Sequence, residues 1–403
     1  MKKHQVAVVG LGQRGASWAE HIMLRPDCDL VAICDTYPDR VKAVQKSAQQ
    51  KNIDTIRYAV SDYKQLLDKK EIEIVILITA WEYHVDLSVD FMKAGIITAL
   101  EVGGAYALDD CYRLIQAYEE TKTPFFFMEN CCYGKRETMI LNMVNQGVFG
   151  EIVHCSGSYA HDLRSEIAHG EETRHYRYRN YLVRNCDNYP THELGPIARI
   201  LNINHGNRML QLSSTASKAA GLSQYISDHC EKENKADFKQ GDIVTTVITC
   251  AGGETIVLTL DTTLPRYYSR GFEVRGTKGM YFEDNDMIFL DKEHYPKYEF
   301  HSKPLWGNAS EYEEQYLTDI WRQEIDTSWG HDGMDTQMFN DFLNCVEQGK
   351  PMPIDVYDAA TWMCISCLSE ASIKKGGAPV EIPDFTRGKW ILTESNKSTT
   401  VDA

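Results

Sequence analysis

Three glycines with the spacing Gly-x-Gly-x-x-Gly, Gly10, Gly12 and Gly15, follow the apolar run Val6–Val9. In this pattern the first glycine permits a tight turn, the second lets the backbone approach a pyrophosphate, and the third lets helix and strand pack closely. Asp35 follows Gly15 by twenty residues, at the end of the next apolar run, where a carboxylate can bind an adenosine ribose. The pattern predicts a dinucleotide site. A carboxylate repels a 2′-phosphate and no Arg follows directly, so NAD is favoured over NADP.

Three polar stretches stand where apolar runs end: Trp81–His84, Glu101–Val102 and Asn130. The carboxyl ends of parallel strands are where doubly wound sheets bind ligands. These stretches are therefore candidates for the rim of the same site. For Trp81, His84 and Asn130 the alternative is a structural role, as a helix cap or a packing side chain.

The segment 163–190 is dense in Arg, Tyr, His and Asn and poor in aliphatic residues. We expect it to lie outside the core and to line a polar pocket for a small molecule. Just after it, His192 stands between Pro190 and Gly195–Pro196, which fix the local backbone, and a rigid His in a polar loop is a candidate general acid or base. The alternatives are a structural His192 and a solvated face for the Arg and Tyr run 174–179.

Short apolar runs alternate with amphipathic stretches over the first 130 residues, which predicts a doubly wound, parallel α/β domain of the Rossmann type. The expected strands are Gln5–Val9, Leu30–Asp35, Ile74–Thr79, Ile97–Glu101 and Phe125–Glu129. The expected helices are Asp39–Gln50, Tyr83–Lys93 and Leu108–Glu120.

A second α/β domain is expected over residues 131–390, where strand-like runs follow one another with short, turn-rich links. That arrangement predicts an open, mainly antiparallel sheet. The runs are Ile152–Tyr159, Ile243–Cys250, Thr255–Asp261 and Phe272–Gly276. Asp335–Glu347 and Tyr357–Lys374 have the pattern of amphipathic helices and are candidates to pack back on the first domain. The tail 395–403 is expected to be disordered.

The charge and the hydropathy pattern exclude several classes of partner. The 403 residues include 42 Lys and Arg against 58 Asp and Glu, a net charge of −16, which disfavours nucleic acid and anionic lipid. No apolar run is long enough to span a bilayer, and the N-terminus lacks the pattern of a signal peptide. We therefore expect a cytoplasmic protein with no nucleic-acid or membrane partner.

The 12 cysteines are scattered among apolar neighbours. We expect reduced, buried thiols; at the Cys364–Cys367 spacing the alternative is a metal-binding or redox pair. No metal-binding residues are predicted.

Taken together, the motifs resemble the NAD(P)-dependent sugar oxidoreductases that include glucose–fructose oxidoreductase and inositol dehydrogenase. Longer strings are similar to the family 109 glycoside hydrolases, NAD-requiring α-N-acetylgalactosaminidases. These strings are Trp81–His84, Glu101–Val102, Glu129–Gly134, Tyr159–Arg164 and Asn188–His192.

Several positions depart from the two family patterns. Sugar dehydrogenases usually carry Glu-Lys-Pro with a catalytic Lys where this chain has Val102 and Gly103, and they place an Asp and a His four residues apart where Glu193 precedes Ile197 here. Family 109 usually has Pro where Gly103 stands, and many members carry an export signal.

The family 109 resemblance implies a redox route to glycoside cleavage. Tightly held NAD takes a hydride from C3 of the sugar, and the resulting ketone acidifies C2–H so that a base can remove that proton. The anomeric substituent leaves by elimination, water adds to the unsaturated ketone, and the hydride returns to C3. The cofactor is regenerated in each turnover, and paired carboxylates are not required.

The resemblance also implies roles for single residues. His192 would handle the O3 proton, and Tyr159 would be the C2 base with its pKa lowered by Arg177, although the two roles could be exchanged. The expected cofactor contacts, with the glycine motif, are Gly10, Gly12, Gln13, Arg14, Gly15, Asp35, Trp81, Glu82, Tyr83, His84, Glu101, Val102, Asn130 and His192. The expected substrate contacts are Tyr159, Arg177, Tyr189, Pro190, Thr191, His192 and, in preference to Tyr267, Tyr268.

The expected activity is hydrolysis of terminal α-N-acetylgalactosaminides or related hexosides. The first alternative is an NAD-dependent sugar dehydrogenase that releases NADH, and the second is a non-catalytic NAD-binding regulator. Because an open sheet face would leave a large apolar patch in water, we also expect a homo-oligomer.

Overall fold

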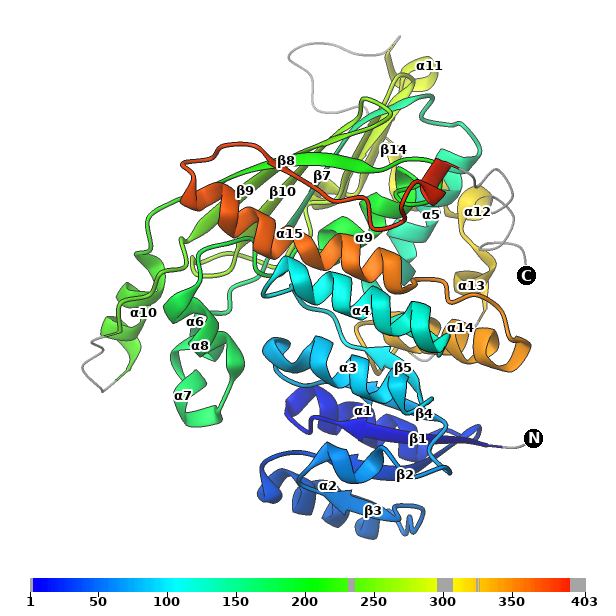
Figure 1. The fold of residues 1–403 in the computed structure, drawn as a ribbon. Coiled ribbons are helices and arrows are strands. Elements are labelled where there is room, and N and C mark those ends of the chain that lie inside the picture. The colour runs from blue at the N-terminus through cyan, green and yellow to red at the C-terminus, as the bar shows by residue number, and fades with distance from the viewer. Residues whose placement is uncertain (1–2, 231–235, 296–306, 324, 326, 392–403) are drawn as a thin grey trace. The chain divides into compact units, whose positions relative to one another are not determined.

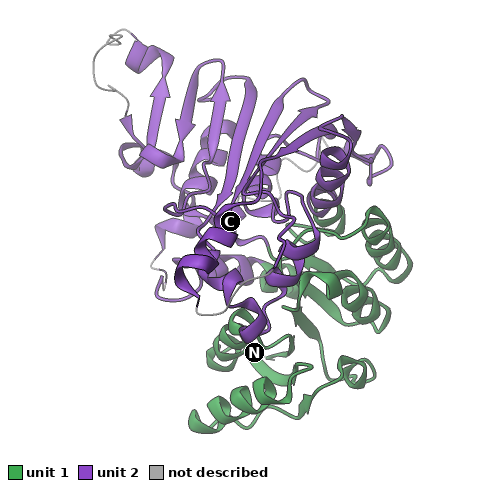
Figure 2. Cartoon of the chain, turned by 90° about the vertical axis from the view of Figure 1, so that its left-hand side faces the viewer, with its two compact units in different colours: residues 1–128, 342–360 green, residues 129–341, 361–403 purple. Residues whose placement is uncertain are grey.

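The computed structural model describes residues 3–230, 236–295, 307–323, 325 and 327–391. The tail 395–403 lies outside these residues. Contacts divide the chain into unit 1, residues 1–128 and 342–360, and unit 2, residues 129–341 and 361–403 (Figure 2). Among the described residues, no helix is both long and apolar enough to cross a lipid bilayer.

Unit 1 contains a parallel sheet with the strand order β3-β2-β1-β4-β5-β6 (Figure 1). This is the order of the doubly wound dinucleotide-binding fold, so the predicted fold class is confirmed. The strands are β1 His4–Val9, β2 Cys28–Cys34, β3 Tyr58–Val60, β4 Ile74–Leu77, β5 Ile97–Leu100 and β6 Phe125–Phe127. The helices are α1 Gln13–Leu24, α2 Pro38–Gln50, α3 His84–Lys93 and α4 Leu108–Thr121, with short 3-10 helices η1 Tyr63–Leu66 and η2 Trp81–Tyr83.

Phe342–Ala360, late in the chain, also belongs to unit 1. The Phe342 ring stacks on Phe126 of β6 at 5.0 Å between centroids. The backbone N–H of Phe127 donates to the carbonyl of Ile354 at 3.1 Å. The segment therefore lies along β6, the last strand of the sheet.

The sheet of unit 2 has nine strands within the described residues, in the order β14-β13-β12-β11-β7-β10-β9-β8-β15. All pairs are antiparallel except β7 and β10, which run parallel. Parallel strands need a long connection, and the chain between β7 and β10 is long enough to include several helices and two other strands. The strands are β7 Ile152–Ala160, β8 Met209–Ala216, β9 Ile243–Cys250, β10 Thr255–Asp261, β11 Glu273–Gly276, β12 Gly279–Phe282, β13 Met287–Leu290, β14 Gly307–Asn308 and β15 Val380–Glu381.

Helix α9, Thr191–Ile200, packs against β7 and against the 3-10 helix η3, Asn130–Tyr133. Its apolar side chains Leu194 and Ile197 are fully buried. The other α-helices that begin in unit 2 are α5 Lys135–Asn145, α6 Arg164–Ala168, α7 Gly170–Thr173, α8 Tyr176–Val183, α10 Gly221–His229, α11 Asp291–His294, α12 Glu313–Tyr316, α13 Asp319–Arg322 and α14 Met334–Gln348. Helix α15, Val356–Lys374, begins in unit 1 and ends in unit 2.

The prediction that 163–190 lies outside the core is wrong for several residues. Tyr181 is buried and its hydroxyl lies 2.7 Å from that of Thr262. Arg184 is buried and pairs with Glu370 at 2.9 Å. These polar side chains are buried because partners satisfy their hydrogen-bonding groups, a compensation that composition does not reveal.

All 12 cysteines are described, and none forms a disulfide. Cys364 and Cys367 lie on α15, where their thiols contact the carbonyls of Thr361 and Cys364, both at 3.2 Å. The pair therefore has the environment of reduced helical thiols.

Candidate functional site

The glycine motif of unit 1 leaves open space at one of its three positions. Gly10 has φ +91°, and a Cβ there would lie 2.2 Å from the carbonyl oxygen of Ile78. A Cβ on Gly15 would lie 1.8 Å from the carbonyl oxygen of Gly10, so the strand and helix meet closely at this position. At Gly12 the nearest atom is Nη1 of Arg40, at 3.8 Å. Space beside this backbone is what the approach of a pyrophosphate requires.

Helix α1 begins at Gln13, directly after Gly12. Gly12 provides no side-chain cap, and the first turn carries no acidic residue. The N-terminal N–H groups and the helix dipole therefore favour an anion at this point.

Asp35, at the end of β2, has a buried carboxylate fixed by backbone donors. Oδ2 accepts from the N–H of Leu11 at 2.7 Å, and Oδ1 accepts from the N–H of Tyr37 at 2.8 Å. Nη1 of Arg40 lies 3.5 Å from Oδ2, and the guanidinium also lies over the Tyr37 ring. Arg40 does not follow Asp35 directly in the sequence and was not predicted; α2 brings it back to the carboxylate. These features fit the pyrophosphate and ribose of a dinucleotide.

Two further predicted cofactor residues are joined in unit 1. Arg14, in the first turn of α1, donates through Nε to Oε2 of Glu101 at 2.9 Å. The other carboxylate oxygen of Glu101 accepts from the N–H of Val102 at 3.0 Å. The start of α1 and the end of β5 are therefore linked at the carboxyl edge of the sheet.

The predicted residues 81–84 divide into buried and exposed side chains. Trp81 and His84 are buried, whereas Tyr83 is exposed. His84 contacts the carbonyl of Thr79 through Nε2 at 3.1 Å, and burial lowers the pKa of His84 to about 4. His84 is therefore neutral near pH 7. Glu82 accepts from the Tyr106 hydroxyl at 3.5 Å.

Gly103 departs from the family pattern for a steric reason. A Cβ at this position would lie 2.4 Å from Cδ1 of Trp81 and 2.8 Å from Nε1. The indole occupies the space of a side chain at residue 103, so a proline here would displace Trp81.

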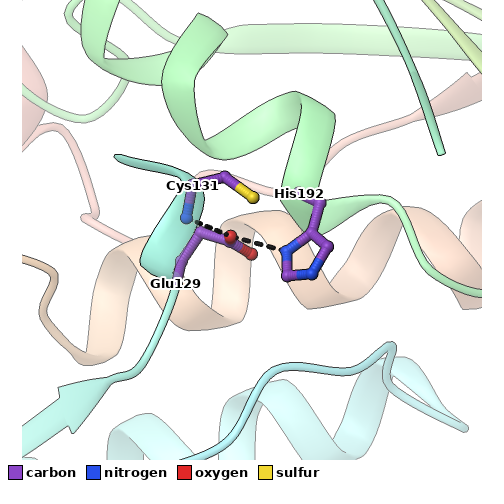
Figure 3. A group of neighbouring side chains, drawn as sticks. All are labelled: Glu129, Cys131 and His192. Atoms are coloured by element: carbon purple, nitrogen blue, oxygen red, sulfur yellow. Dashed lines mark hydrogen bonds and ion pairs between the residues drawn. The ribbon is translucent and has the colours of Figure 1, made fainter. Parts of the chain in front are cut away.

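In unit 2, Glu129, just before η3, and His192, in the first turn of α9, form a second polar cluster. His192 Nδ1 lies 2.7 Å from Oε1 of Glu129, as Figure 3 shows. The same oxygen accepts from the N–H of Cys131 at 3.1 Å. Glu129 is fully buried. A Cβ on Gly195 would lie 2.7 Å from Cγ of Glu129, so the absence of a side chain there lets Glu129 reach α9.

Aromatic side chains lie around the imidazole of His192, on the side of Nε2. The Tyr189 hydroxyl lies 3.3 Å from His192 Nε2. The rings of Tyr159 and Tyr189 have centroids 4.4 Å apart, and that of Tyr159 lies 5.6 Å from His192. The Tyr159 hydroxyl lies 3.4 Å from Nδ1 of His161, whose ring contacts Tyr268 at 5.2 Å.

Arg177, from α8, completes this cluster. Its guanidinium lies over the Tyr189 ring at 5.4 Å, and Nη1 donates to Glu166 at 2.7 Å. The structure thus brings together Tyr159, Arg177, Tyr189, His192 and Tyr268, with Pro190 and Thr191 at the start of α9. Asn130 points elsewhere in unit 2: its Nδ2 donates to Asp335 at 2.9 Å.

The pKa shifts assign different protonation states to the cluster. Burial acts to raise the pKa of Glu129, but its interaction with His192 lowers it overall, so Glu129 is ionised. Burial raises the pKa of Tyr159, and the opposing effect of Arg177 is too small to reverse this. The expectation that Arg177 lowers the pKa of Tyr159 below its usual value is therefore wrong. Burial, followed by the charge of Arg177, lowers the pKa of His161 and keeps that ring neutral.

Glu129 and His161 stand in strings that resemble family 109, Glu129–Gly134 and Tyr159–Arg164, but neither was predicted as a site residue. His161 follows Tyr159 by two residues near the end of β7, and that spacing was a usable signal for a shared face. Glu129 and His192 are 63 positions apart, and no local pattern connects them. The cluster contains two pairs of side chains that can exchange protons. His192 is hydrogen-bonded to Glu129, and Tyr159 contacts His161.

Two protein families match the chain over most of its length. Residues 4–128 match the oxidoreductase family with an NAD-binding Rossmann fold. Residues 133–392 match the C-terminal domain of glycosyl hydrolase 109.

Individual proteins agree with these matches. A glycosyl hydrolase family 109 protein of Parabacteroides distasonis is 37% identical, with 96% of this chain and 88% of the relative covered. An alpha-N-acetylgalactosaminidase of Tannerella forsythia is 35% identical, with 95% and 86% covered. The solved structure of a levoglucosan dehydrogenase with NADH and levoglucosan shares the fold at TM-score 0.71 and 15% identity, over 95% of this chain and all of that one. The chain belongs to glycosyl hydrolase family 109.

Proposed function

We propose that this protein is an NAD-dependent glycosidase that cleaves terminal α-linked N-acetylgalactosaminides or related hexosides. The observation that carries the proposal is the presence of two proton-exchanging pairs in one cluster. His192 lies 2.7 Å from Glu129, and Tyr159 lies 3.4 Å from His161. Oxidation of a hydroxyl requires one proton acceptor, whereas elimination across C1 and C2 requires a second. The family membership and the name of the Tannerella relative support the same activity.

His192 acts at the sugar O3 in this proposal. Its Nδ1 is held by Glu129, so Nε2, which lies toward Tyr189, is the nitrogen that receives the O3 proton. The ionised Glu129 stabilises the imidazolium that results and fixes the ring orientation. The proton returns to O3 at the end of the cycle.

Tyr159 acts at C2. Because burial raises the pKa of Tyr159, its hydroxyl keeps its proton in the free protein. As Tyr159 takes the C2 proton, its own proton therefore passes to the neutral His161 through the contact at 3.4 Å. The anomeric group leaves as an alkoxide in the same elimination. When water adds, its hydroxyl bonds to C1, the reverse transfer returns a proton to C2, and the second water proton goes to the departed alkoxide.

Unit 1 would hold the cofactor through the backbone beside Gly12, the first turn of α1 and Asp35. When bound, NAD supplies the acceptor for the C3 hydride and returns that hydride later. Val102 stands where sugar dehydrogenases carry the catalytic Lys, so that proton acceptor is absent here, and the proposal assigns its role to His192.

The test is incubation of the protein with an aryl α-N-acetylgalactosaminide in deuterated buffer. Release of the aryl alcohol with deuterium at C2 and no net NADH supports the proposal. Stoichiometric NADH without aryl alcohol instead identifies a sugar dehydrogenase. Bound NAD with neither product identifies a non-catalytic NAD-binding protein. The conclusion that the protein is non-catalytic also requires that a panel of other aryl hexosides gives no product.

A further inference from the structure

A cysteine, a histidine and a carboxylate face one another in unit 2. One ligand atom from each of Glu129, Cys131 and His192 lies within 4.8 Å of the other two (Figure 3). No other such group of three occurs among the residues that the structure describes. Glu129 and Cys131 are buried, and only His192 retains some exposure. His192, with 11% of its side chain exposed, is therefore the member of the cluster in contact with solvent.

A second observation points to a cation at this position. Oε2 of Glu129 is buried and meets no donor at full hydrogen-bond geometry among the described residues; the Thr191 hydroxyl interacts with the Glu129 carboxylate. A buried carboxylate oxygen without a partner is costly, and buried charges are normally paired or bound to metal. The thiol of Cys131 lies on the same side as the imidazole, as Figure 3 shows.

We propose that Glu129, Cys131 and His192 form a binding site for one thiophilic divalent cation of the Zn²⁺ class. Thiolate, imidazole and carboxylate are the donors that Zn²⁺ takes in proteins, and three protein ligands leave its fourth position open. Hard cations such as Mg²⁺ and Ca²⁺ prefer oxygen ligands and are disfavoured here.

The charges balance when the cation binds. The thiol of Cys131 gives its proton to solvent and becomes a thiolate, and His192 turns its Nδ1 lone pair to the metal with its proton on Nε2. The two negative ligands then neutralise the two positive charges of the cation. Nη1 of Arg270, 3.8 Å from the sulfur, adds a donor to the thiolate. Binding therefore releases one proton and requires no oxidant or reductant.

The cation replaces the hydrogen bond between His192 and Glu129. Because the proposed function uses that pair to handle the O3 proton, we infer that the cation inhibits turnover. This second statement rests on the proposed function, whereas binding of the cation does not.

The direct test is a titration of the protein, saturated with NAD, with Co²⁺ as the spectroscopic probe. We expect a sulfur-to-cobalt charge-transfer band and the visible bands of a tetrahedral site, saturating at one Co²⁺ per chain and lost when Zn²⁺ is added. Cys131→Ser and Cys131→Ala should each lose the charge-transfer band. Cys132→Ser, a change in the adjacent buried thiol, should keep it.

Circular dichroism and thermal unfolding establish that each variant is folded before its spectrum is interpreted. Absence of the band in the folded wild type, or its survival in both Cys131 variants, overturns the metal site. Glycosidase activity is measured separately, with Zn²⁺ and then with excess EDTA. A cobalt spectrum without any Zn²⁺ inhibition keeps the site and overturns the inhibitory effect.

Discussion

The candidate sites of unit 1 and unit 2 are made of different kinds of chemical group. In unit 1 the ligand-facing groups are mostly backbone: space beside Gly12, the first turn of α1, and Asp35 fixed by two backbone N–H groups. In unit 2 they are side chains from separate elements, such as Glu129 and His192. A backbone site is specified by local sequence, whereas a side-chain site depends on the packing of distant segments. Substitutions should therefore separate cofactor affinity from chemistry.

The largest effect is expected for His192→Ala. Loss of a general acid or base typically slows a reaction by about 10²–10⁴-fold, and the paired Glu129 would also be left buried without its partner. We expect kcat for an aryl α-N-acetylgalactosaminide to fall by about 10³-fold or more. NAD affinity, measured by calorimetry, should change little because unit 1 is untouched. His154→Ala, which removes a histidine of the same unit outside the cluster, is the control. Retained turnover in His192→Ala would exclude His192 from the chemistry.

Tyr159→Phe distinguishes the role of the Tyr159–His161 pair from that of the His192–Glu129 pair in unit 2. The change removes the hydroxyl beside His161 but leaves His192 and Glu129 in place. We expect the rate of aryl alcohol release to fall by about 10²-fold or more while a substrate-dependent NADH signal persists in single-turnover measurements. Deuterium exchange at C2 should be lost. If exchange at C2 continued at the wild-type rate, another group would be the C2 base.

Gly12→Ala is the corresponding change in unit 1. The nearest atom to a new Cβ is 3.8 Å away, and the backbone at Gly12 has φ −62°, so the fold should accept the methyl group. The methyl group would occupy the space that a pyrophosphate needs. We expect NAD affinity to fall by about 10-fold or more, a loss of at least about 1.4 kcal/mol, with the melting temperature unchanged. Unaltered NAD affinity would place the pyrophosphate elsewhere.

The same contrast explains how much the sequence could predict. The glycine motif and Asp35 directly follow the strands that position them, so their places in unit 1 followed from spacing. Strand β3, Tyr58–Val60, was missed because it is only three residues long and only partly buried. Arg40 was missed because a helical turn, not adjacency, brings it to Asp35.

In unit 2 the residues were identified better than their interactions. The strings around Tyr159 and His192 indicated polar chemistry, but nothing local pairs His192 with a carboxylate 63 positions away. Burial also reversed the expected direction for the pKa of Tyr159, because desolvation outweighs the charge of Arg177. Desolvation depends on what covers a side chain, and this is a property of the packed structure.

Two carboxyl groups of unit 2 lack the partners that Asp35 has in unit 1. Burial raises the pKa of Asp187 to about 7, and burial followed by Asp187 raises that of Glu193 well above its usual value. Oδ1 of Asp187 and both carboxyl oxygens of Glu193 are buried without hydrogen bonds among the described residues. The folded state therefore holds protons that the unfolded state releases above pH 3.8, so stability falls as pH rises from about 4 to 7.

Asp187→Asn should reduce the loss of stability between about pH 4 and pH 7. The amide cannot ionise, and its oxygen can still accept from Thr246. We expect the free energy of unfolding at pH 8 to rise by about 1–2 kcal/mol relative to the wild type, measured by urea denaturation. Asp319→Asn, at an exposed position of the same unit, should have no such effect. A pH profile for Asp187→Asn parallel to that of the wild type would show that Asp187 does not titrate in this range.

Arg40→Ala should have the smallest effect, and it tests whether one side chain modulates a site made of backbone. The guanidinium lies 3.5 Å from Asp35 and 3.8 Å from the position of a Cβ on Gly12, so it offsets part of the negative charge that repels a 2′-phosphate. Its removal should weaken NADP binding by about 3-fold to 10-fold, in the range of one partly exposed charge interaction, and leave NAD affinity within about 2-fold. Calorimetry with both dinucleotides measures the ratio, and Arg57→Ala, which removes a cation of unit 1 away from Asp35, is the control. An equal loss for NAD and NADP would mean that Arg40 contacts the shared pyrophosphate, because only a contact near the ribose can distinguish the two cofactors.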